Sequence, residues 1–335
     1  MECRGYLRAS TKKISIIITL SLRNSPLLYL HKKHYLLDGF CSFLYSAPMN
    51  NMAIYKIQSI GEKLPLARFE KTLNRFSKVL NYAFKGGVLT LGMAPLCPGP
   101  FRIILESGDL QQVESLQLTA DELIINDALA ISYDESHAWK VVEPDKTQDF
   151  ATLKPVVKES FDLYRQGLSE VSMAFFLISN AAPLKGFDEE LRKTFQLGLL
   201  KLEQENSPEF VPLFKGRGKG LTPSGDDFLC GYLLALGWLE KQGLGDFADL
   251  REALYKAALG TNILVNSFLF QSYKFWLDAD WQDFFNAFAC SDLNEVSHTQ
   301  KRILGYGATS GADLLYGVYM ALSKHLNLQG FKEAG

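Results

Sequence analysis

The hydrophobic pattern of this chain changes its period near Pro144, and this change limits the fold more than any other feature. Upstream, between Gly87 and Val142, short apolar runs are separated by turn sequences, as the strands of a compact sheet are. Downstream, apolar residues recur every three or four positions, which is the period of a helix packed on one face. We therefore predict an α+β fold in which a β-rich N-terminal domain is followed by a mostly α-helical C-terminal domain.

The individual elements follow from the same pattern. The predicted strands are Gly87–Gly92, Phe101–Leu105, Glu122–Ile125, Leu129–Ser132 and Trp139–Val142. Short strands at this spacing favour a small antiparallel sheet or barrel, and we expect an amphipathic helix over Leu66–Phe84 before it. The predicted helices are Phe228–Lys241, Asp249–Leu259, Asn262–Trp276 and Leu314–His325, with another through Leu191, Phe195, Leu199 and Leu202. The domains are expected at residues 51–146 and 147–330, joined by Pro144–Phe150.

The first fifty residues differ in composition from the rest. Residues 1–48 contain seven basic and two acidic residues, a balance of +5, in a chain whose formal charge is −2. The apolar run Ile14–Leu22 is too short to span a bilayer, so no membrane span is expected. Two interpretations stay open: a targeting or interfacial segment, or non-native sequence upstream of a start at Met49 or Met52. We favour the second and expect residues 1–50 to be disordered or non-native, because globular sequence begins just after Met52.

Composition excludes several classes of protein. With 335 residues, 47% of them hydrophobic and 21% charged, the chain is long enough for one large or two ordinary domains. No cluster of Lys and Arg beyond residue 50 resembles the footprint of a nucleic-acid-binding protein, so we expect no such partner. The five cysteines include no C-x-x-C pair and the five histidines no H-E-x-x-H motif. These patterns predict a cytoplasmic location and no zinc or histidine-bound metal.

One glycine-rich motif carries most of the functional information. The run Gly216–Gly231 reads G-R-G-K-G-L-T-P-S-G-D-D-F-L-C-G and leads into an apolar helix. Such a loop presents free amides and the positive end of a helix dipole, which suit a phosphate or a carboxylate. The spacing matches neither a Walker loop, since Gly220 follows Lys219, nor the G-x-G-x-x-G of a dinucleotide fold. The motif therefore predicts an anion site without implying ATP or NAD.

The motif has an echo later in the chain. Gly305–Gly317 reads G-Y-G-A-T-S-G-A-D-L-L-Y-G, so that Ser310 and Asp313 align on Ser224 and Asp227. We hypothesise that two helix N-termini converge on one pocket and hold an anion from two sides. The candidate binding residues of the second motif are Thr309, Ser310, Gly311 and Asp313.

A purely structural interpretation competes with this one. Each S-x-x-D is a variant of the capping box, which would use the serine and the aspartate to start a helix. Gly231 and Gly317 could serve only to let two helices approach closely. Capping leaves the extra carboxylate Asp226 and the loop glycines unexplained, and we therefore favour a functional role for the first motif.

The acidic pair of the first motif has several possible roles. Asp226 and Asp227 are the candidate catalytic residues; they could ligate Mg²⁺ or orient a substrate amide, while the hydroxyls of Thr222 and Ser224 contact an anion. These choices stay open at this point, and no cofactor is firmly implied. Lys215, Arg217 and Lys219 could add positive charge, although a basic loop is more often solvated. Cys230, inside an apolar run, is interpreted as a small buried side chain rather than a nucleophile.

The two motifs, together with Leu89–Leu91 and Gly99–Ile103, resemble the AllH-like family, which is associated with oxamate carbamoyltransferase. The likeness covers roughly Ile54–His325. It implies a subunit that acts with FdrA-like and AllG-like chains in purine and allantoin breakdown. The reaction exchanges a carbamoyl group between oxalurate and phosphate, so the expected ligand is a small anion such as carbamoyl phosphate or oxamate.

If this role carries over, the chemistry of the loop suggests roles for single residues. Phosphate or the oxamate carboxylate would bind at Gly218, Gly220, Thr222, Ser224 and Gly225. Asp226 or Asp227 would orient the carbamoyl amide or hold a metal, and helix amides would meet a developing oxyanion. Two alternatives stay open: a non-catalytic assembly subunit, and a Mg²⁺-dependent hydrolase that uses Asp226, Asp227 and Asp313.

Overall fold

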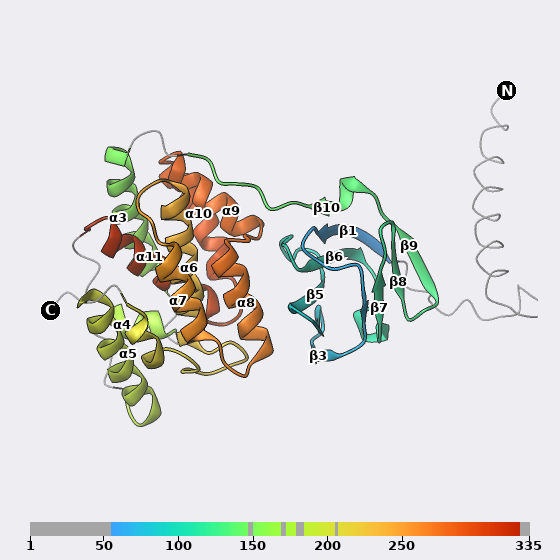
Figure 1. Ribbon diagram of the computed structural model, residues 1–335, viewed down its shortest axis with the longest axis horizontal. Helices are drawn as coiled ribbons and strands as arrows, with labels where there is room; N and C mark the ends of the chain where they lie inside the picture. Colours follow the sequence, from blue (N-terminus) through green and yellow to red (C-terminus); the bar gives the residue numbers. More distant parts are fainter. Residues whose placement is uncertain (1–54, 147–149, 169–171, 179–183, 205–206, 329–335) are drawn as a thin grey trace, which may run out of the picture. The chain divides into compact units, whose positions relative to one another are not determined.

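The computed structural model describes residues 55–146, 150–168, 172–178, 184–204 and 207–328. All of them belong to one compact unit, Ala53–Gly335. The expectations for residues 1–50 lie outside the described residues, as does part of the expected linker. Strands occupy residues 56–139 and long helices follow from residue 150, as the colours of Figure 1 show. The predicted α+β class, with sheet before helices, is therefore confirmed.

The β-rich part consists of two sheets. Its strands are β1 (Lys56–Gly61), β2 (Arg68–Phe69), β3 (Thr72–Arg75), β4 (Val79–Phe84), β5 (Gly87–Met93), β6 (Arg102–Ser107), β7 (Leu116–Leu118), β8 (Glu122–Ile125), β9 (Leu129–Ser132) and β10 (Ala138–Trp139). A six-stranded sheet has the order β10-β1-β6-β5-β4-β3, and a four-stranded sheet has the order β2-β7-β8-β9. Side chains from both sheets form one apolar core, including Phe69, Leu91 and Leu123.

The expectation of an antiparallel sheet holds for one of the two sheets, and the expected helix is wrong. The six-stranded sheet is mixed, because β5 pairs with β6 and β1 with β10 in parallel, whereas the four-stranded sheet is antiparallel. The residues Leu66–Phe84 form β2, β3 and β4 instead of a helix. Their apolar residues fit either period over so short a stretch, but Phe69, Leu80 and Tyr82 are buried in the core of the sheets. β4 pairs with its chain neighbours β3 and β5, and β2 pairs with β7, so strand pairing overrides the helical pattern.

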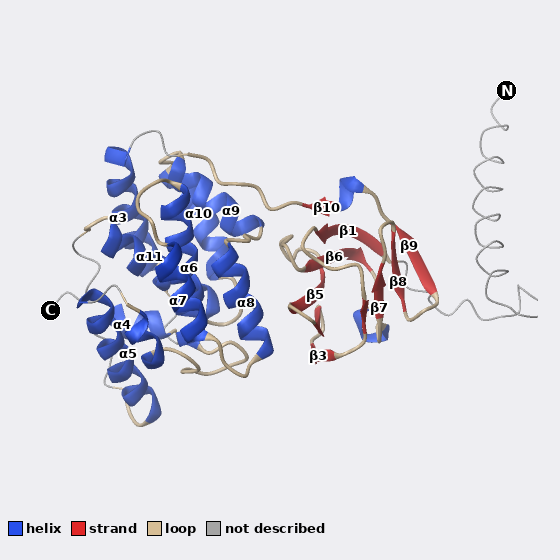
Figure 2. Cartoon of the chain, in the orientation of Figure 1, coloured by secondary structure: helices blue, strands red, loops and turns tan. Residues whose placement is uncertain are grey.

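The helical part contains nine α-helices in the described residues (Figure 2). They are α3 (Phe150–Gln166), α4 (Met173–Ile178), α5 (Phe187–Gln204), α6 (Ser224–Lys241), α7 (Ala248–Ala258), α8 (Ile263–Lys274), α9 (Ala279–Ala289), α10 (Leu293–Leu304) and α11 (Ser310–His325). Every residue of α6 from Ser224 to Leu239 is buried, as expected of a helix that is apolar on all sides. None of the described helices is long and apolar enough to cross a membrane.

Helices α6 and α11 touch through their backbones. A Cβ on Gly231 would lie 1.9 Å from the carbonyl oxygen of Leu314, and one on Gly317 would lie 2.1 Å from that of Phe228. No side chain fits at either position, so the two glycines allow the close approach that was one of the sequence interpretations. The contact also fixes the starts of α6 and α11, and with them the two glycine motifs, next to each other.

The β-rich part contacts the helices through α8 and the loop that precedes α9. The backbone N–H of Val88 donates a 3.0 Å hydrogen bond to the Ser267 hydroxyl. The ring of Phe101 packs edge-on against Trp276, with 5.8 Å between the centroids. These contacts bring the start of β6, which carries Arg102, to the ends of the helices.

Candidate functional site

The two glycine motifs meet through their side chains. The hydroxyls of Thr222 and Ser310 are 3.1 Å apart, and the Thr222 hydroxyl donates to Asp227 Oδ2 at 3.2 Å. The Ser310 hydroxyl also interacts with the Asp227 carboxyl. In the same way, Ser224 of the first motif interacts with Asp313 of the second. The serine of each motif thus interacts with the aspartate of the other motif.

This exchange replaces the capping boxes that the sequence suggested. The cap positions of α6 and α11 are Pro223 and Thr309, and neither helix has a side-chain capping hydrogen bond. The capping-box interpretation is therefore wrong for both motifs. Sequence spacing suggested it because serine and aspartate are three residues apart in each motif, but the actual partners are about ninety residues apart and only the fold pairs them.

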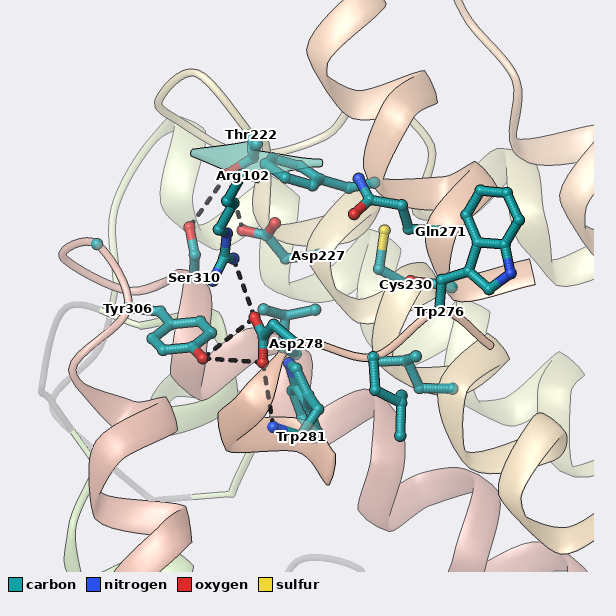
Figure 3. Close-up of a pocket in the computed structure, with 16 residues that line it drawn as sticks. Arg102, Thr222, Asp227, Cys230, Gln271, Trp276, Asp278, Trp281, Tyr306 and Ser310 are labelled. Atoms are coloured by element: carbon teal, nitrogen blue, oxygen red, sulfur yellow. Dashed lines mark hydrogen bonds and ion pairs between the residues drawn. The ribbon is translucent and has the colours of Figure 1, made fainter. Parts of the chain in front are cut away.

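A cavity of about 250 Å³ opens beside this junction. Its polar lining includes Arg102, Thr222, Asp227, Gln271, Ser272, Asp278, Tyr306 and Ser310. Its apolar lining consists of Leu234, Phe268, Trp276, Leu277, Trp281 and Leu314. Figure 3 shows Arg102, Ser310, Tyr306 and Asp278 gathered at one end, whereas Gln271, Cys230 and Trp276 lie toward the other. A mostly apolar cavity with a few convergent polar groups is the usual form of a small-molecule site.

The β-rich part supplies the one arginine of this lining. Arg102 Nη2 is 2.9 Å from Asp278 Oδ2, and its Nη1 donates to the carbonyl oxygen and to the sulfur of Cys97 at 3.0 and 2.7 Å. Burial lowers the pKa of Arg102, but its neighbours, the carboxylate of Asp278 among them, raise it by more. Burial raises the pKa of the Cys97 thiol to about 12, so this cysteine is a neutral hydrogen-bonding partner rather than a nucleophile.

Tyr306 extends the polar group toward a second ion pair. Its hydroxyl is 2.8 Å from Asp280 Oδ2 and 3.2 Å from both carboxylate oxygens of Asp278. Asp280 in turn pairs with Arg302 at 3.1 Å. Burial raises the pKa of Tyr306 well above its usual value, and Asp278 raises it further. Tyr306 is therefore a neutral hydroxyl between the carboxylates of Asp280 and Asp278, and it can donate its one proton to either of them.

The acidic residues predicted as catalytic have different surroundings. Asp227 lines the cavity; burial raises its pKa well above that of an ordinary aspartate, while Ser310 and Thr222 lower it in part. Asp226 is not among the lining residues, and its Oδ1 accepts the backbone N–H of Gly216 at 2.9 Å. Asp226 thus fixes the shape of the loop, whereas Asp227 faces the cavity.

The predicted binding residues divide in the same way. Only Thr222 and Ser310 line the cavity; the others, which do not, are Gly218, Gly220, Ser224, Gly225, Thr309, Gly311 and Asp313. Gly218 has φ of +123°, and a Cβ there would lie 2.5 Å from the Ser224 nitrogen, so a glycine is needed for the turn itself. The N–H of Gly225 donates to the carbonyl oxygen of Arg217, and the N–H of Asp226 donates to that of Pro223. The amides at the start of α6 are therefore used inside the loop.

The three basic residues of the first motif point to other partners. Lys215 donates to the Ala257 carbonyl at 3.0 Å, and Arg217 to that of Pro212 at 3.3 Å. Lys219 forms an ion pair with Asp188 at 2.8 Å. None of the three lines the cavity, so its positive charge comes from Arg102 instead.

The carboxylates do not converge as metal ligands. Within the described ranges, no three His, Cys, Asp or Glu side chains gather as a possible metal site. Asp226 faces the amide of Gly216, and Asp313 Oδ1 accepts the amide of Ala174 at 3.0 Å. The geometry thus gives no support to a hydrolase that holds Mg²⁺ between Asp226, Asp227 and Asp313.

Sequence reasoning missed Asp278 and did not single out Arg102 or Tyr306. Arg102 belongs to the Gly99–Ile103 stretch and Tyr306 to the second motif, so both lie in sequences that were already noted. No comparable sequence pattern surrounds Asp278. It is the N-cap residue of α9, and its Oδ1 accepts the N–H of Trp281 at 3.1 Å. Pairing Arg102 with Asp278 required the tertiary structure.

Comparison with known proteins gives one match. Residues 214–322 match the model of the family described as oxamate carbamoyltransferase subunit AllH, which confirms over this segment the resemblance seen in the motifs. The segment contains both glycine motifs and runs from just before α6 nearly to the end of α11. No curated protein and no solved structure matches the chain significantly.

Proposed function

From the match to AllH over the helices that build the cavity, we propose that this chain is a subunit of an oxamate carbamoyltransferase complex and takes part in its chemistry. The reaction moves a carbamoyl group between oxalurate and phosphate, giving oxamate and carbamoyl phosphate. The proposed partners are FdrA-like and AllG-like chains, in the cytoplasm and in purine or allantoin breakdown. The proposed ligand of the cavity is one of these small anions.

The observation that carries the proposal is the position of the cavity. It lies where the two motifs of the family exchange side chains, and Thr222, Asp227 and Ser310 all line it. Residues that served only to start helices would have no reason to face a cavity. The buried guanidinium of Arg102 adds the positive group that a carboxylate or phosphate requires.

The lining suggests a role for each polar group. Arg102 would bind the negative group of the substrate. The hydroxyls of Thr222 and Ser310 would donate to the carbamoyl oxygen, where negative charge develops during attack on the carbamoyl carbon. Asp227 would accept from the carbamoyl amide and so orient the group, and Asp226 would act indirectly by fixing the loop through Gly216.

The test uses the complete complex and an isosteric substitution. Thr222→Val removes one hydroxyl from the cavity and keeps the shape of the side chain, so we expect the kcat of carbamoyl transfer to fall about 10- to 100-fold because a donor is lost. Thr261→Val, at an exposed threonine outside the cavity, is the matched control and should keep full activity. Equal activities of the two variants would reject the catalytic role.

One alternative has a specific observation in its favour. Helix α5 exposes three large apolar side chains, Phe187, Leu197 and Leu200, at 59, 49 and 55% of their surface, as a helix that binds a partner chain does. A non-catalytic assembly subunit would need this surface and not the cavity. The alternative predicts full activity of the assembled Thr222→Val complex, so the same experiment separates the two functions.

A further inference from the structure

The charges around the cavity limit the kind of anion that can bind there. The cavity is lined by the guanidinium of Arg102 and by the carboxyl groups of Asp227 and Asp278. The lining thus has one cation beside two acidic groups. The cation already forms a 2.9 Å ion pair with Asp278. Asp227 adds no positive charge in either protonation state.

Positive groups near the cavity are all engaged elsewhere. Lys215 and Arg217 donate to backbone carbonyls, and Lys219 pairs with Asp188. Arg302 pairs with Asp280 and Asp283. No second lysine or arginine is therefore available, among the described residues around the cavity, to share a doubly charged ligand.

The backbone amides do not make up for the missing charge. A phosphate group is usually held by several amides at a helix N-terminus in addition to basic side chains. Here the amides of Gly225 and Asp226 donate to Arg217 and Pro223, and the loop glycines Gly218 and Gly220 do not line the cavity. Among the described residues, the amides at the start of α6 are therefore not directed at the cavity, and its one basic side chain, Arg102, already pairs with Asp278.

A carboxylate joined to an amide fits these groups well. A guanidinium matches the two oxygens of a carboxylate, and Arg102 is the one basic side chain that lines the cavity. The hydroxyls of Thr222 and Ser310 and the carboxyl of Asp227 can pair with an amide, and Trp276 and Trp281 provide an apolar wall. Such a ligand carries one negative charge, whereas phosphate carries between one and two at neutral pH.

We infer that this chain binds the carboxylate-bearing substrate of the transfer, an oxamate-like amide acid held by Arg102, and that the phosphate group of the other substrate is bound outside this cavity. The inference rests on the proposed function and assigns its two substrates to different sites. Asp278 is the specificity-determining residue, because its carboxylate shares the guanidinium and repels a second negative charge. Another chain of the complex would then supply the phosphate subsite.

Calorimetry on the full chain tests this directly, with oxamate and inorganic phosphate as the two ligands. We expect oxamate to bind and phosphate not to bind. Arg102→Gln should weaken the binding of oxamate at least about tenfold. Arg68→Gln, which removes an arginine on β2 that does not line the cavity and pairs with Glu70 and Asp127, is the matched control and should bind oxamate like the wild type.

A second variant tests the role of Asp278. Asp278→Asn keeps a side chain that can cap α9 but removes the negative charge, so phosphate should now bind, at least about tenfold more tightly than to the wild type. Unfolding curves of each variant show whether the fold is kept, and a shift of melting temperature with oxamate gives a second measure of binding.

The outcomes distinguish the inference from the proposed function. Phosphate binding to the wild type as tightly as oxamate, with loss in Arg102→Gln, would overturn the division of substrates but leave a carbamoyltransferase role intact. Binding of neither ligand would also overturn the inference. Failure of the proposed function appears separately, as full activity of the Thr222→Val complex.

Discussion

At the scale of single residues, the buried carboxyl groups depend most on their surroundings. Asp313 is 2% exposed, and its Oδ1 accepts the Ala174 N–H at 3.0 Å. Burial raises its pKa to about 7, although Ser224 and the amides of Ala174 and Met173 lower it in part. Near neutral pH this aspartate therefore changes between a neutral and a charged form inside the protein.

We expect this titration to appear in the stability of the protein. Between about pH 4 and pH 7 the folded chain keeps a proton on Asp313 that the unfolded chain releases, so stability is highest below this range and decreases as pH rises through it. The shift corresponds to at most about 4 kcal/mol. Asp313→Asn keeps the acceptor and cannot ionise, so its unfolding free energy should decrease less between pH 5 and pH 8. Denaturant unfolding at both pH values, with wild type as control, measures this; parallel pH profiles would contradict it.

At the scale of elements, the contact between α6 and α11 determines how the site is built. The two helices approach so closely that Gly231 and Gly317 leave no space for a side chain. Their N-terminal loops are then near enough for Thr222 to contact Ser310. The packing of α6 against α11 therefore also brings the site residues together.

A methyl group at this contact should separate the helices. In Gly317→Ala the new Cβ would lie 2.1 Å from the Phe228 carbonyl oxygen, far inside contact distance. We expect a loss of about 1–3 kcal/mol in unfolding free energy and weaker oxamate binding. Gly260→Ala is the matched control, since a Cβ there meets only the Lys215 side chain at 3.6 Å. Thermal unfolding compares the two; equal melting temperatures would mean that the helices adjust without cost.

At the scale of the whole molecule, the cavity is completed by two parts of the chain that lie far apart in the sequence. Arg102 comes from the β-rich part and Asp278 from the segment before α9, and they are joined by one ion pair. The sheet therefore contributes directly to the candidate site. A helical fragment that begins after residue 146 would lack the arginine.

Hydrogen exchange can measure how firmly the two parts are joined. The Val88 N–H donates to Ser267 on α8 rather than to a neighbouring strand, so its protection reports the contact. Ser267→Ala should increase the exchange rate of this amide about fivefold, which corresponds to a hydrogen bond of about 1 kcal/mol. The amide of Leu91, on the same strand, is the internal control. An unchanged rate at Val88 would show that other contacts hold the sheet in place.

Local patterns predicted much of the architecture. The helices α6, α7, α8 and α11 were found to within a few residues, and so were β5, β6, β8 and β9, because apolar spacing and turn residues lie within one element. The stretch Leu66–Phe84 was assigned wrongly, because its alternating and helical patterns overlap and only strand pairing and burial decide between them. The resemblance to AllH was also visible in the sequence, since each glycine motif is continuous.

The candidate site depended on tertiary structure to a much greater degree. Sequence identified both Ser–Asp motifs and offered a capping box within each as one interpretation, whereas the fold pairs Ser224 with Asp313 and Ser310 with Asp227. It considered the lysines and the arginine of the first loop as a possible source of positive charge, and it gave no role to Arg102 or Asp278. The physical reason is that spacing along a chain describes contacts within a few residues, while burial, ion pairing and the shape of a cavity arise only where distant segments meet.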